Sequence, residues 1–582
     1  MKTEWDLALL YEGLDDPRIE RDQKQADKAI DAFAKKYRKD KKHLKNPAAL
    51  ASALAEYEKL IELPASRAGY YVSFRKELNV EDKAAEALAA KLDERGTKRG
   101  NKILFFALEL GKLPKPMQKK FLAAPVLKPY RYWLQQIFDN AKYDLSEPEE
   151  KVISLLDTVS YDRWVQATEN ILNKKTVEHE DKTLPFPQAL ALVKTLPTEK
   201  RRALYEATRA VTEELGDVAE SEINAVYTSK KIQDELRGFK APYDATILGN
   251  QNDPKSILAL SEAVSGAMSL AHRFYEVKRR LLKEDKLTYA DRSAQVGTIQ
   301  TKVPFEKAVG IVRETFSALN PEYAEIFDRL LLRGQVDVRP KKGKAGGAFC
   351  SSGVTVPTYV LLNHIDDFES VKTLAHEMGH AIHAERAKSQ SPLYQGHSTA
   401  TAETASTFFE TAALRRIIET LPEEDRIVAL HDTIQDNIAT VFRQIACFRF
   451  EQALHEEIRR DGYVPKERIA DLMNEHMQAY LGPVVELERS DGYFFVQWSH
   501  IRRFFYVYTY AYGHLISQAL HEKLAGDSSF IKKIDAFLAA GESKSPYEIF
   551  KSCGLDTKNP EIFRAGLRGI ERDVAELERL VK

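Results

Sequence analysis

The chain of 582 residues has few cysteines and no long uninterrupted apolar stretch. Its three cysteines, Cys350, Cys447 and Cys553, are odd in number and far apart, which excludes a disulfide framework and suits a reducing compartment. No run approaches the roughly 18 apolar residues that a membrane helix needs. The N-terminus lacks the basic start and apolar centre of a signal peptide. These absences predict a cytoplasmic protein that does not bind membranes.

The chain also has almost no net charge. Lys plus Arg number 86 and Asp plus Glu number 87, so the chain as a whole has no electrostatic reason to bind nucleic acid or an anionic membrane. Low-complexity tracts and repeats of fixed period are absent as well, which disfavours a regular solenoid. The composition, 43% apolar and 30% charged, is that of a globular protein, and the chain is too long for one hydrophobic core.

Most of the chain has helical patterning. Apolar residues recur at three- and four-residue spacing in "DPRIERDQKQADKAIDAFAKKYRKD", "PAALASALAEYEKLIEL" and "DKAAEALAAKLDERGTKRGNKILFFALELGKL". A polar, proline-containing stretch at residues 174–187 separates two helical blocks. We therefore expect a helical N-terminal lobe at residues 1–185 and a second domain at residues 186–582.

Helical patterning stops between residues 333 and 366. Glycines gather there, and "GVTVPTYVLLN" predicts a strand. Pro357 predicts an edge position for that strand, because proline has no N–H to donate to a sheet. Long helices resume after Asp366.

The segment "TLAHEMGHAIHAE", residues 373–385, holds three of the 14 histidines of the chain. Its centre, residues 376–380, has the pattern H-E-x-x-H. Residues four apart in a helix lie on one face, so His376 and His380 can direct both imidazoles at one zinc ion. Glu377 is rotated away from that pair, yet it stays near enough to hold a water on the metal and to take its proton.

Zinc needs a third protein ligand. The metzincin pattern H-E-x-x-H-x-x-G-x-x-H is excluded, because Arg386 and His383 occupy the positions of its third histidine and its glycine. Glu403 and Glu410 share one face of a following helical segment, and either could be the ligand while the other supports a ligating histidine by hydrogen bond. His383 as a fourth ligand would close the open position that catalysis needs. We expect it to support the site from outside or to pack in the core.

With these residues in place, the chain resembles the oligoendopeptidase F branch of the thimet-oligopeptidase-like zinc metallopeptidases. The resemblance rests on "GKAGGAFCSSG", "VLLNHIDDFESVKTLAHEMGHAIHAE" and "AETASTFFE". It extends to "EWDLALLY", "FRQIACFRFEQALHE", "HIRRFFYVYTYAYG" and "AAGESKSPYEIFKSCGLD", and so covers essentially the whole chain. It implies a mainly α fold in which two helical lobes enclose a deep substrate channel, with a small β-sheet beside the zinc helix. The second domain would then be the catalytic one.

The resemblance also implies roles, position by position. His376, His380 and Glu403 match the ligands of one zinc ion. Glu377 matches the general base, and Glu410 is similar to a residue that supports the site by hydrogen bond.

Two further groups of residues take their roles from the resemblance. A C-terminal histidine and tyrosines would stabilise the oxyanion, and here they are His500, Tyr506 and Tyr510. The same stretch also holds Tyr508 and Tyr512, and those of its four tyrosines that do not serve the oxyanion are expected to pack helices together. An extended peptide would bind along an edge strand where small residues allow a close backbone approach, and these are Gly346, Gly347, Ala348 and Gly353.

The leading prediction is a zinc oligoendopeptidase that cuts internal bonds of short unfolded oligopeptides. An alternative keeps the metal site but releases C-terminal dipeptides, which requires a cation for the terminal carboxylate, such as Arg502, Arg503 or Lys372. A helical scaffold or peptide-binding protein without catalysis is disfavoured, because the complete set of ligands and the general base are present.

Overall fold

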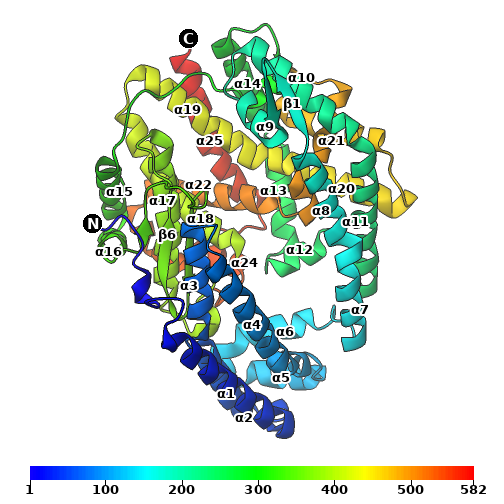
Figure 1. Ribbon diagram of the computed structural model, residues 1–582, viewed down its shortest axis with the longest axis vertical. Helices are drawn as coiled ribbons and strands as arrows, with labels where there is room; N and C mark the ends of the chain where they lie inside the picture. The colour runs from blue at the N-terminus through cyan, green and yellow to red at the C-terminus, as the bar shows by residue number, and fades with distance from the viewer. The chain divides into compact units, whose positions relative to one another are not determined.

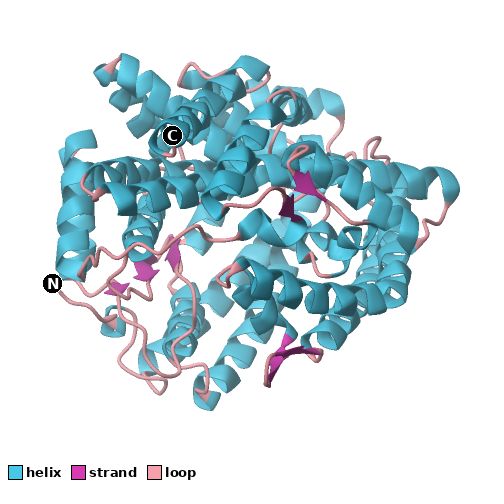
Figure 2. Cartoon of the chain, turned by 90° about the horizontal axis from the view of Figure 1, so that it is seen from above, coloured by secondary structure: helices cyan, strands magenta, loops and turns pink.

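A computed structural model describes the backbone of residues 1–582 and every side chain except those of Glu147, Lys151 and Ser154. The protein is mainly α, as the sequence predicts, and its strands are few and short (Figure 2). Among the described residues, no helix is both long enough and apolar enough to span a bilayer.

The chain divides into two compact units, and each is built from segments that are discontinuous in sequence. The first unit comprises Met1–Asp144, Lys302–Ile417 and Ser528–Cys553, and the second comprises Leu145–Thr301, Ile418–Asp527 and Gly554–Lys582. Each unit combines segments from both sides of residue 185. This division by compactness therefore does not test the boundary expected between residues 185 and 186, which stays a prediction.

The first unit holds the segment in which the sequence places the histidine cluster. Its helices are α1 Pro17–Lys39, α2 Pro47–Ile61, α3 Ala65–Leu78, α4 Lys83–Gly111, α5 Lys115–Ala123, α6 Arg131–Asn140, α15 Phe305–Leu319, α16 Pro321–Leu332, α17 Phe368–Ala387, most of α18 Thr399–Glu419, α23 Ile531–Leu538 and α24 Pro546–Ser552. Its strands are β4 Val336–Asp337, β5 Phe349–Gly353 and β6 Val356–Leu361.

The second unit is helical apart from two pairs of short strands. Its helices are α7 Glu147–Asp157, α8 Arg163–Asn173, α9 Phe186–Val193, α10 Thr198–Glu214, α11 Gly216–Arg237, α12 Asp244–Gly249, α13 Pro254–Ser265, α14 Met268–Leu282, α19 Glu423–Ile438, α20 Gln444–Asp461, α21 Lys466–Leu481, α22 Tyr508–Gly526 and α25 Pro560–Leu580. Its strands are β1 Thr176–His179, β2 Lys182–Pro185, β3 Leu287–Thr288 and β7 Val485–Glu486. The polar stretch at 174–187 therefore contains a hairpin, because β1 pairs antiparallel with β2.

The small sheet of the first unit has the order β4-β6-β5. The strand that contains Pro357 is thus central, and the expectation that it lies at the edge is wrong. Pro357 is tolerated because β4 pairs only with Val360 and Leu361, and because the pairing with β5 is irregular between Ser351 and Gly353. The edge strands of this sheet are β4 and β5.

The N-terminal segment packs against this sheet. Trp5 is buried beside Phe74 and Tyr359, and its indole N–H donates to the backbone oxygen of Val360 (2.8 Å). The Tyr359 hydroxyl in turn donates to the backbone oxygen of Asp6 (2.8 Å). Residues far apart in sequence therefore fix β6, the strand that lies along α17 (Figure 1).

Acid is expected to destabilise the second unit through His431, which lies on α19 and is fully buried. Burial, together with the charge of Lys278, lowers the pKa of His431 to about 4 despite its hydrogen bond to Asp432. Because the unfolded chain binds this proton near pH 6.5 and the folded chain only near pH 4, the free energy of unfolding falls as pH drops through that window. The loss from His431 alone reaches about 3 kcal/mol.

The measurement is urea unfolding at pH 7, 5.5 and 4.5, followed by tryptophan fluorescence. A His431→Gln variant should show a shallower loss of stability with acid than the wild type, whereas His179→Gln in the β1–β2 hairpin should leave the slope unchanged. Equal slopes for the wild type and His431→Gln would refute this assignment.

Candidate metal centre

Helix α17 presents the H-E-x-x-H residues within the first unit. It begins where the Asp367 carboxylate accepts both the N–H (2.9 Å) and the hydroxyl (2.6 Å) of Ser370, so the first turn is capped. The helix packs against β5 and β6 (Figure 1). His376 and His380 lie on one face with ring centroids 4.9 Å apart, as their spacing predicts.

Among the described residues, one group of three or more possible donors is close enough to hold a metal ion, and it consists of His376, His380 and Glu403. Their ligand atoms all lie within 4.8 Å of one another. Glu403 Oε2 is 3.7 Å from His376 Nε2 and 4.0 Å from His380 Nε2. Tetrahedral zinc with bonds of about 2.0–2.1 Å separates its ligand atoms by roughly 3.4 Å. The three donors therefore fit zinc after small side-chain adjustments.

Glu410 holds His376 from behind. Its carboxylate lies 2.7 Å from His376 Nδ1, which keeps a proton on that nitrogen and leaves Nε2 facing Glu403. Burial lowers the pKa of His376, but the hydrogen bond and charge of Glu410 outweigh burial and raise this pKa to about 9. Burial holds the pKa of His380 down at about 3, so His380 is neutral, the form that binds a metal.

Glu377 lies against the edge strand. It is only 7% exposed, and its carboxylate lies beside Cys350 in β5. Burial raises the pKa of Glu377 to about 7, although the charge of His376 opposes the shift. A carboxylate with a pKa close to neutral is suited to accept and return a proton.

The small residues expected to bind substrate lie in β5 and in the loop before it. A Cβ added at Gly346 or Gly347 would meet nothing within 4 Å, and at Gly353 it would touch the ring of Tyr70. Ala348 is half-buried between them. Because β5 pairs only with β6 among the described strands, its other side can accept an added strand next to Glu377.

Two residues that the sequence interpretation missed hold this loop. Asn363 donates to the backbone oxygens of Ala345 (2.9 Å) and Gly347 (2.8 Å). The buried ammonium of Lys344 pairs with Asp337 of β4 (2.7 Å). Their one signal in the sequence is that both are polar residues at the ends of the segment that holds the glycines and the predicted strand.

His383 is not part of the donor group. It is 1% exposed, stacks on His397 with ring centroids 4.4 Å apart, and contacts Phe537. Burial lowers its pKa well below the usual value. This position fits packing behind the metal centre.

The C-terminal residues expected to stabilise the oxyanion gather within the second unit. The Tyr510 hydroxyl donates to the Tyr506 hydroxyl (3.3 Å), and the His500 ring lies 5.9 and 6.2 Å from the two phenol rings. Tyr506 and Tyr510 are half-buried, whereas Tyr508 and Tyr512 are fully buried. The structure thus separates two accessible phenols from two that pack in the core, and their roles stay predictions.

A strained turn presents this cluster. Phe504 (φ 44°) and Phe505 (φ 60°) both have left-handed backbone conformations, which are unfavourable for bulky side chains. Thr246 donates to the backbone oxygen of Phe504 (2.9 Å), and the buried Glu451 carboxylate accepts the N–H of Phe505. These bonds hold the turn in place just before Tyr506.

Arg502 also belongs to the support of this turn. It is 4% exposed and forms a two-pronged ion pair with Glu222 (2.8 and 3.0 Å). The same guanidinium donates to the backbone oxygens of Phe495, Val496 and Trp498. Arg502 is therefore committed to the interior of the second unit and is not available to hold the terminal carboxylate of a substrate.

Gly379 sets the distance between α17 and α18, and its replacement by alanine is expected to disturb the metal centre. A Cβ at this position would lie 2.9 Å from Ser406 Cα and 3.1 Å from Phe409 Cβ, so the helix that carries Glu403 would have to move away. We expect Gly379→Ala to cost about 1–3 kcal/mol of stability and to weaken metal binding.

Urea unfolding and metal content after dialysis against a zinc buffer measure both effects. Gly310→Ala on α15 is the matched control, because nothing lies within 4 Å of its added Cβ, and a helical alanine there should be neutral or stabilising. Unchanged stability and metal content in Gly379→Ala would mean that the helices can separate without cost.

Family models match the chain over two ranges of residues. A family model described as Peptidase family M3 matches residues 191–569, and one described as Oligopeptidase F matches residues 109–173. Oligopeptidase PepF of Bacillus subtilis is 24% identical over 481 residues, which is 80% of this chain and 71% of that protein. An Oligoendopeptidase F homolog of Lactococcus lactis is 23% identical over 594 residues and covers 100% of this chain and 98% of its own.

Solved structures share the fold. A Chlamydophila abortus protein described as a candidate peptidase superposes with a TM-score of 0.88 at 21% identity, over 99% of this chain and 98% of that one. The oligoendopeptidase-F of Enterococcus faecium has a TM-score of 0.67 at 21% identity, over 97% of each chain.

Proposed function

Because this chain belongs to peptidase family M3, within its oligoendopeptidase F branch, and is a metallopeptidase, we propose that it is a zinc-dependent oligoendopeptidase that cleaves internal bonds of short unfolded peptides. The observation that carries the proposal is the convergence of His376, His380 and Glu403 within 4.8 Å beside the buried Glu377.

Two imidazoles and one carboxylate make the donor set of a catalytic zinc site, because they leave one coordination position open. A zinc ion held there would supply Lewis-acid polarisation of the peptide carbonyl and a water of lowered pKa. Glu410 keeps His376 in the correct tautomer and orientation, and Ser406 donates to Glu403 (3.3 Å).

Glu377 would act as the general base and then as the general acid. Its carboxylate takes the proton of the attacking water and later gives it to the nitrogen of the leaving amine. The carboxylate lies beside Cys350 of β5, the strand along which the extended peptide would lie. Gly346, Gly347, Ala348 and Gly353 would let that peptide approach the edge of the sheet.

Tyr506, Tyr510 and His500 are the proposed donors to the oxyanion. A preorganised phenol or imidazole is typically worth about 100-fold or more in kcat. Tyr506 and Tyr510 lie four residues apart and already point their hydroxyls at each other, which supports a joint role.

The exopeptidase alternative loses one of its candidate cations, because Arg502 is buried and paired with Glu222. Lys372 pairs with Glu369 (3.2 Å), and Arg503 is exposed beside the Tyr506 ring. Peptide substrates are proposed in either case. Three free cysteines support a reducing compartment such as the cytoplasm.

The test is the hydrolysis of a peptide of about ten varied residues with both termini free, followed by mass spectrometry. We expect internal cuts that a chelator abolishes and that added zinc restores. Stepwise release of C-terminal dipeptides would favour the exopeptidase alternative, and hydrolysis that survives complete removal of the metal would reject the proposed mechanism.

A further inference from the structure

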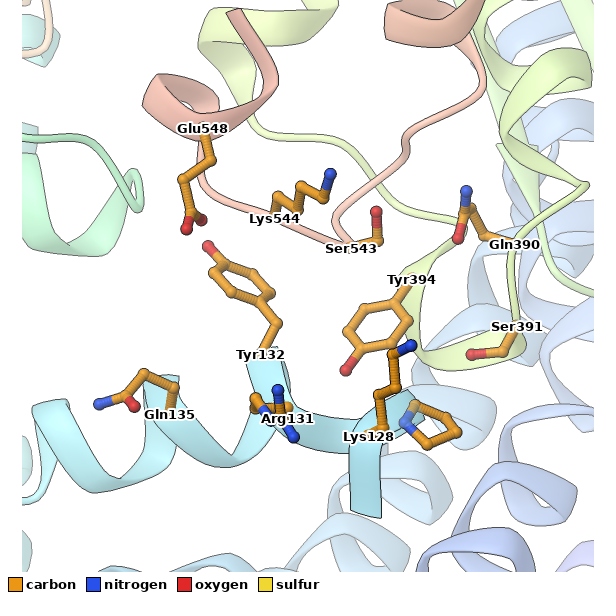
Figure 3. A pocket seen from close by; sticks show the side chains of 11 residues that line it. Lys128, Arg131, Tyr132, Gln135, Gln390, Ser391, Tyr394, Ser543, Lys544 and Glu548 are labelled. Carbon is orange, nitrogen blue, oxygen red and sulfur yellow. The ribbon is translucent and has the colours of Figure 1, made fainter. Parts of the chain in front are cut away.

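The first unit contains a polar pocket of about 600 Å³ that the proposed chemistry does not use (Figure 3). Three segments far apart in sequence line it. They are residues 128–135 at the start of α6, residues 390–394 between α17 and α18, and residues 543–548 at the start of α24. Figure 3 shows the first and third segments on opposite sides, with Tyr394 between them. Its volume is typical of sites for small ligands.

The lining of the pocket carries an excess of positive charge. Lys128, Arg131 and Lys544 are exposed, and none of the three forms an ion pair with any described residue. Glu548 also lines the pocket and keeps its negative charge while its carboxylate accepts the N–H (3.1 Å) and the hydroxyl (3.0 Å) of Ser545, so three cations face one anion and the lining stays net positive. Three unpaired cations around one concavity produce a potential that attracts anions.

The walls of the pocket are held together without these cations. Gln390 donates to the backbone oxygen of Ala539 (2.7 Å), and the Tyr394 hydroxyl accepts the N–H of Trp133 (3.2 Å). The N–H of Glu542 donates to the backbone oxygen of Tyr394 (2.9 Å). The three segments are therefore tied in place before any ligand arrives, which lowers the entropic cost of binding.

The remaining lining suits a peptide. The rings of Tyr132 and Tyr394 contribute apolar faces, Gln135 and Gln390 contribute amides, and Ser391 and Ser543 contribute hydroxyls. Arg131 offers the planar fork that binds a carboxylate through two parallel hydrogen bonds. A carboxylate attached to a peptide chain thus matches both the charge and the surface of this pocket.

We propose that the pocket bounded by Lys128, Arg131 and Lys544 is an anchoring subsite for a carboxylate of the peptide substrate. The carboxylate comes either from the free C-terminus or from an acidic side chain. This inference rests on the proposed peptidase function. From His380 to the end of α17 the helix rises about 10 Å, and three more residues lead to Gln390. The path along the chain from His380 to Gln390 is therefore at most about 20 Å, so a spacer of no more than roughly six extended residues would separate the scissile bond from the carboxylate.

Three peptides that are identical except at one position and at the C-terminus test the subsite. The first has a free C-terminus and no acidic side chain, the second has an amidated C-terminus and one Glu, and the third has an amidated C-terminus with Gln in place of Glu. For the wild type at low salt, we expect the KM of the third, neutral peptide to exceed by about tenfold the KM of whichever of the first two peptides carries the recognised carboxylate. The kcat values should be similar, because the anchor binds the ground state and the transition state alike. The peptide that shows the lower KM identifies the source of the carboxylate.

The double variant Arg131→Ala/Lys544→Ala should raise the KM of the recognised carboxylate-bearing peptide about tenfold. It should leave the KM of the neutral peptide unchanged. The control Lys119→Ala/Lys120→Ala removes the same charge from exposed positions of α5 and should change neither value. Equal KM values for all three peptides in the wild type, or an equal shift in both double variants, would overturn the proposal.

Calorimetric binding of the same peptides to the wild-type holoenzyme separates this proposal from the proposed function. If no peptide is cleaved, the oligoendopeptidase assignment fails. Binding that requires both the carboxylate and the pocket cations would still support the subsite, and binding that is indifferent to either would reject it.

Discussion

Replacing Glu377 with Gln is expected to lower kcat by about 100- to 10,000-fold while the protein keeps its fold and its metal. The amide has the shape of the carboxylate, so the packing of this side chain beside Cys350 of β5 survives. What disappears is the ability to take a proton from water and to return it to the leaving amine. The measurement is kcat and KM on a cleaved peptide, together with zinc content per chain.

Three observations would make this loss specific to proton transfer. KM should change little, added zinc should not restore activity, and Glu369→Gln on the exposed first turn of α17 should leave kcat within about twofold of wild type. A Glu377→Gln variant that retained most of its kcat would place the general base elsewhere. Loss of zinc along with activity would make Glu377 part of the metal-binding set.

The pairing of the two histidines was predictable because its geometry is local. A spacing of four residues in a helix brings His376 and His380 onto one face whatever surrounds them. The choice between Glu403 and Glu410 was not local, since both share one face of α18. It depends on how α18 lies against α17, and the structure places Glu403 near both imidazole Nε2 atoms and Glu410 at Nδ1 of His376.

Other features depend on contacts between distant segments, and the sequence could not supply them. In the sequence, Gly379 is only one of the two variable positions of H-E-x-x-H, and nothing there indicates that α17 and α18 approach closely at this residue. The edge position predicted from Pro357 failed because strand order is set by pairing with β4, which lies twenty residues upstream. The mainly α composition was predictable because helical periodicity persists over long stretches.

The residues that line the pocket could not be predicted from the sequence either. Lys128, Gln390 and Lys544 are ordinary polar residues in three separate connections, and only the folded first unit gathers them. In the same way, Arg502 was a plausible ligand for a terminal carboxylate until its partner Glu222, 280 residues upstream, was known. Long-range pairing decides which charged groups remain available to a substrate.

Replacing Glu403 with Ala is expected to abolish stoichiometric metal binding. The variant leaves His376 and His380 as the two remaining donors, and a catalytic zinc site needs three protein ligands. Zinc content should fall from about one per chain to near zero after dialysis against a zinc buffer, and activity should fall with it. The affinity loss should exceed the 10- to 100-fold that removal of a supporting residue costs.

Glu410→Gln provides that comparison, because Glu410 contacts His376 Nδ1 rather than the metal position. We expect it to weaken zinc binding by about 10- to 100-fold and to regain activity in excess zinc, whereas Glu377→Gln should not. Glu419→Gln, exposed at the end of the same helix, should bind zinc as the wild type does. If Glu410→Gln lost its metal and Glu403→Ala kept it, Glu410 would be the ligand and α18 would have to turn to bring it there. The order of the zinc affinities of Glu403→Ala, Glu410→Gln and Glu419→Gln therefore shows which of Glu403 and Glu410 is the metal ligand, a choice that their spacing alone leaves open.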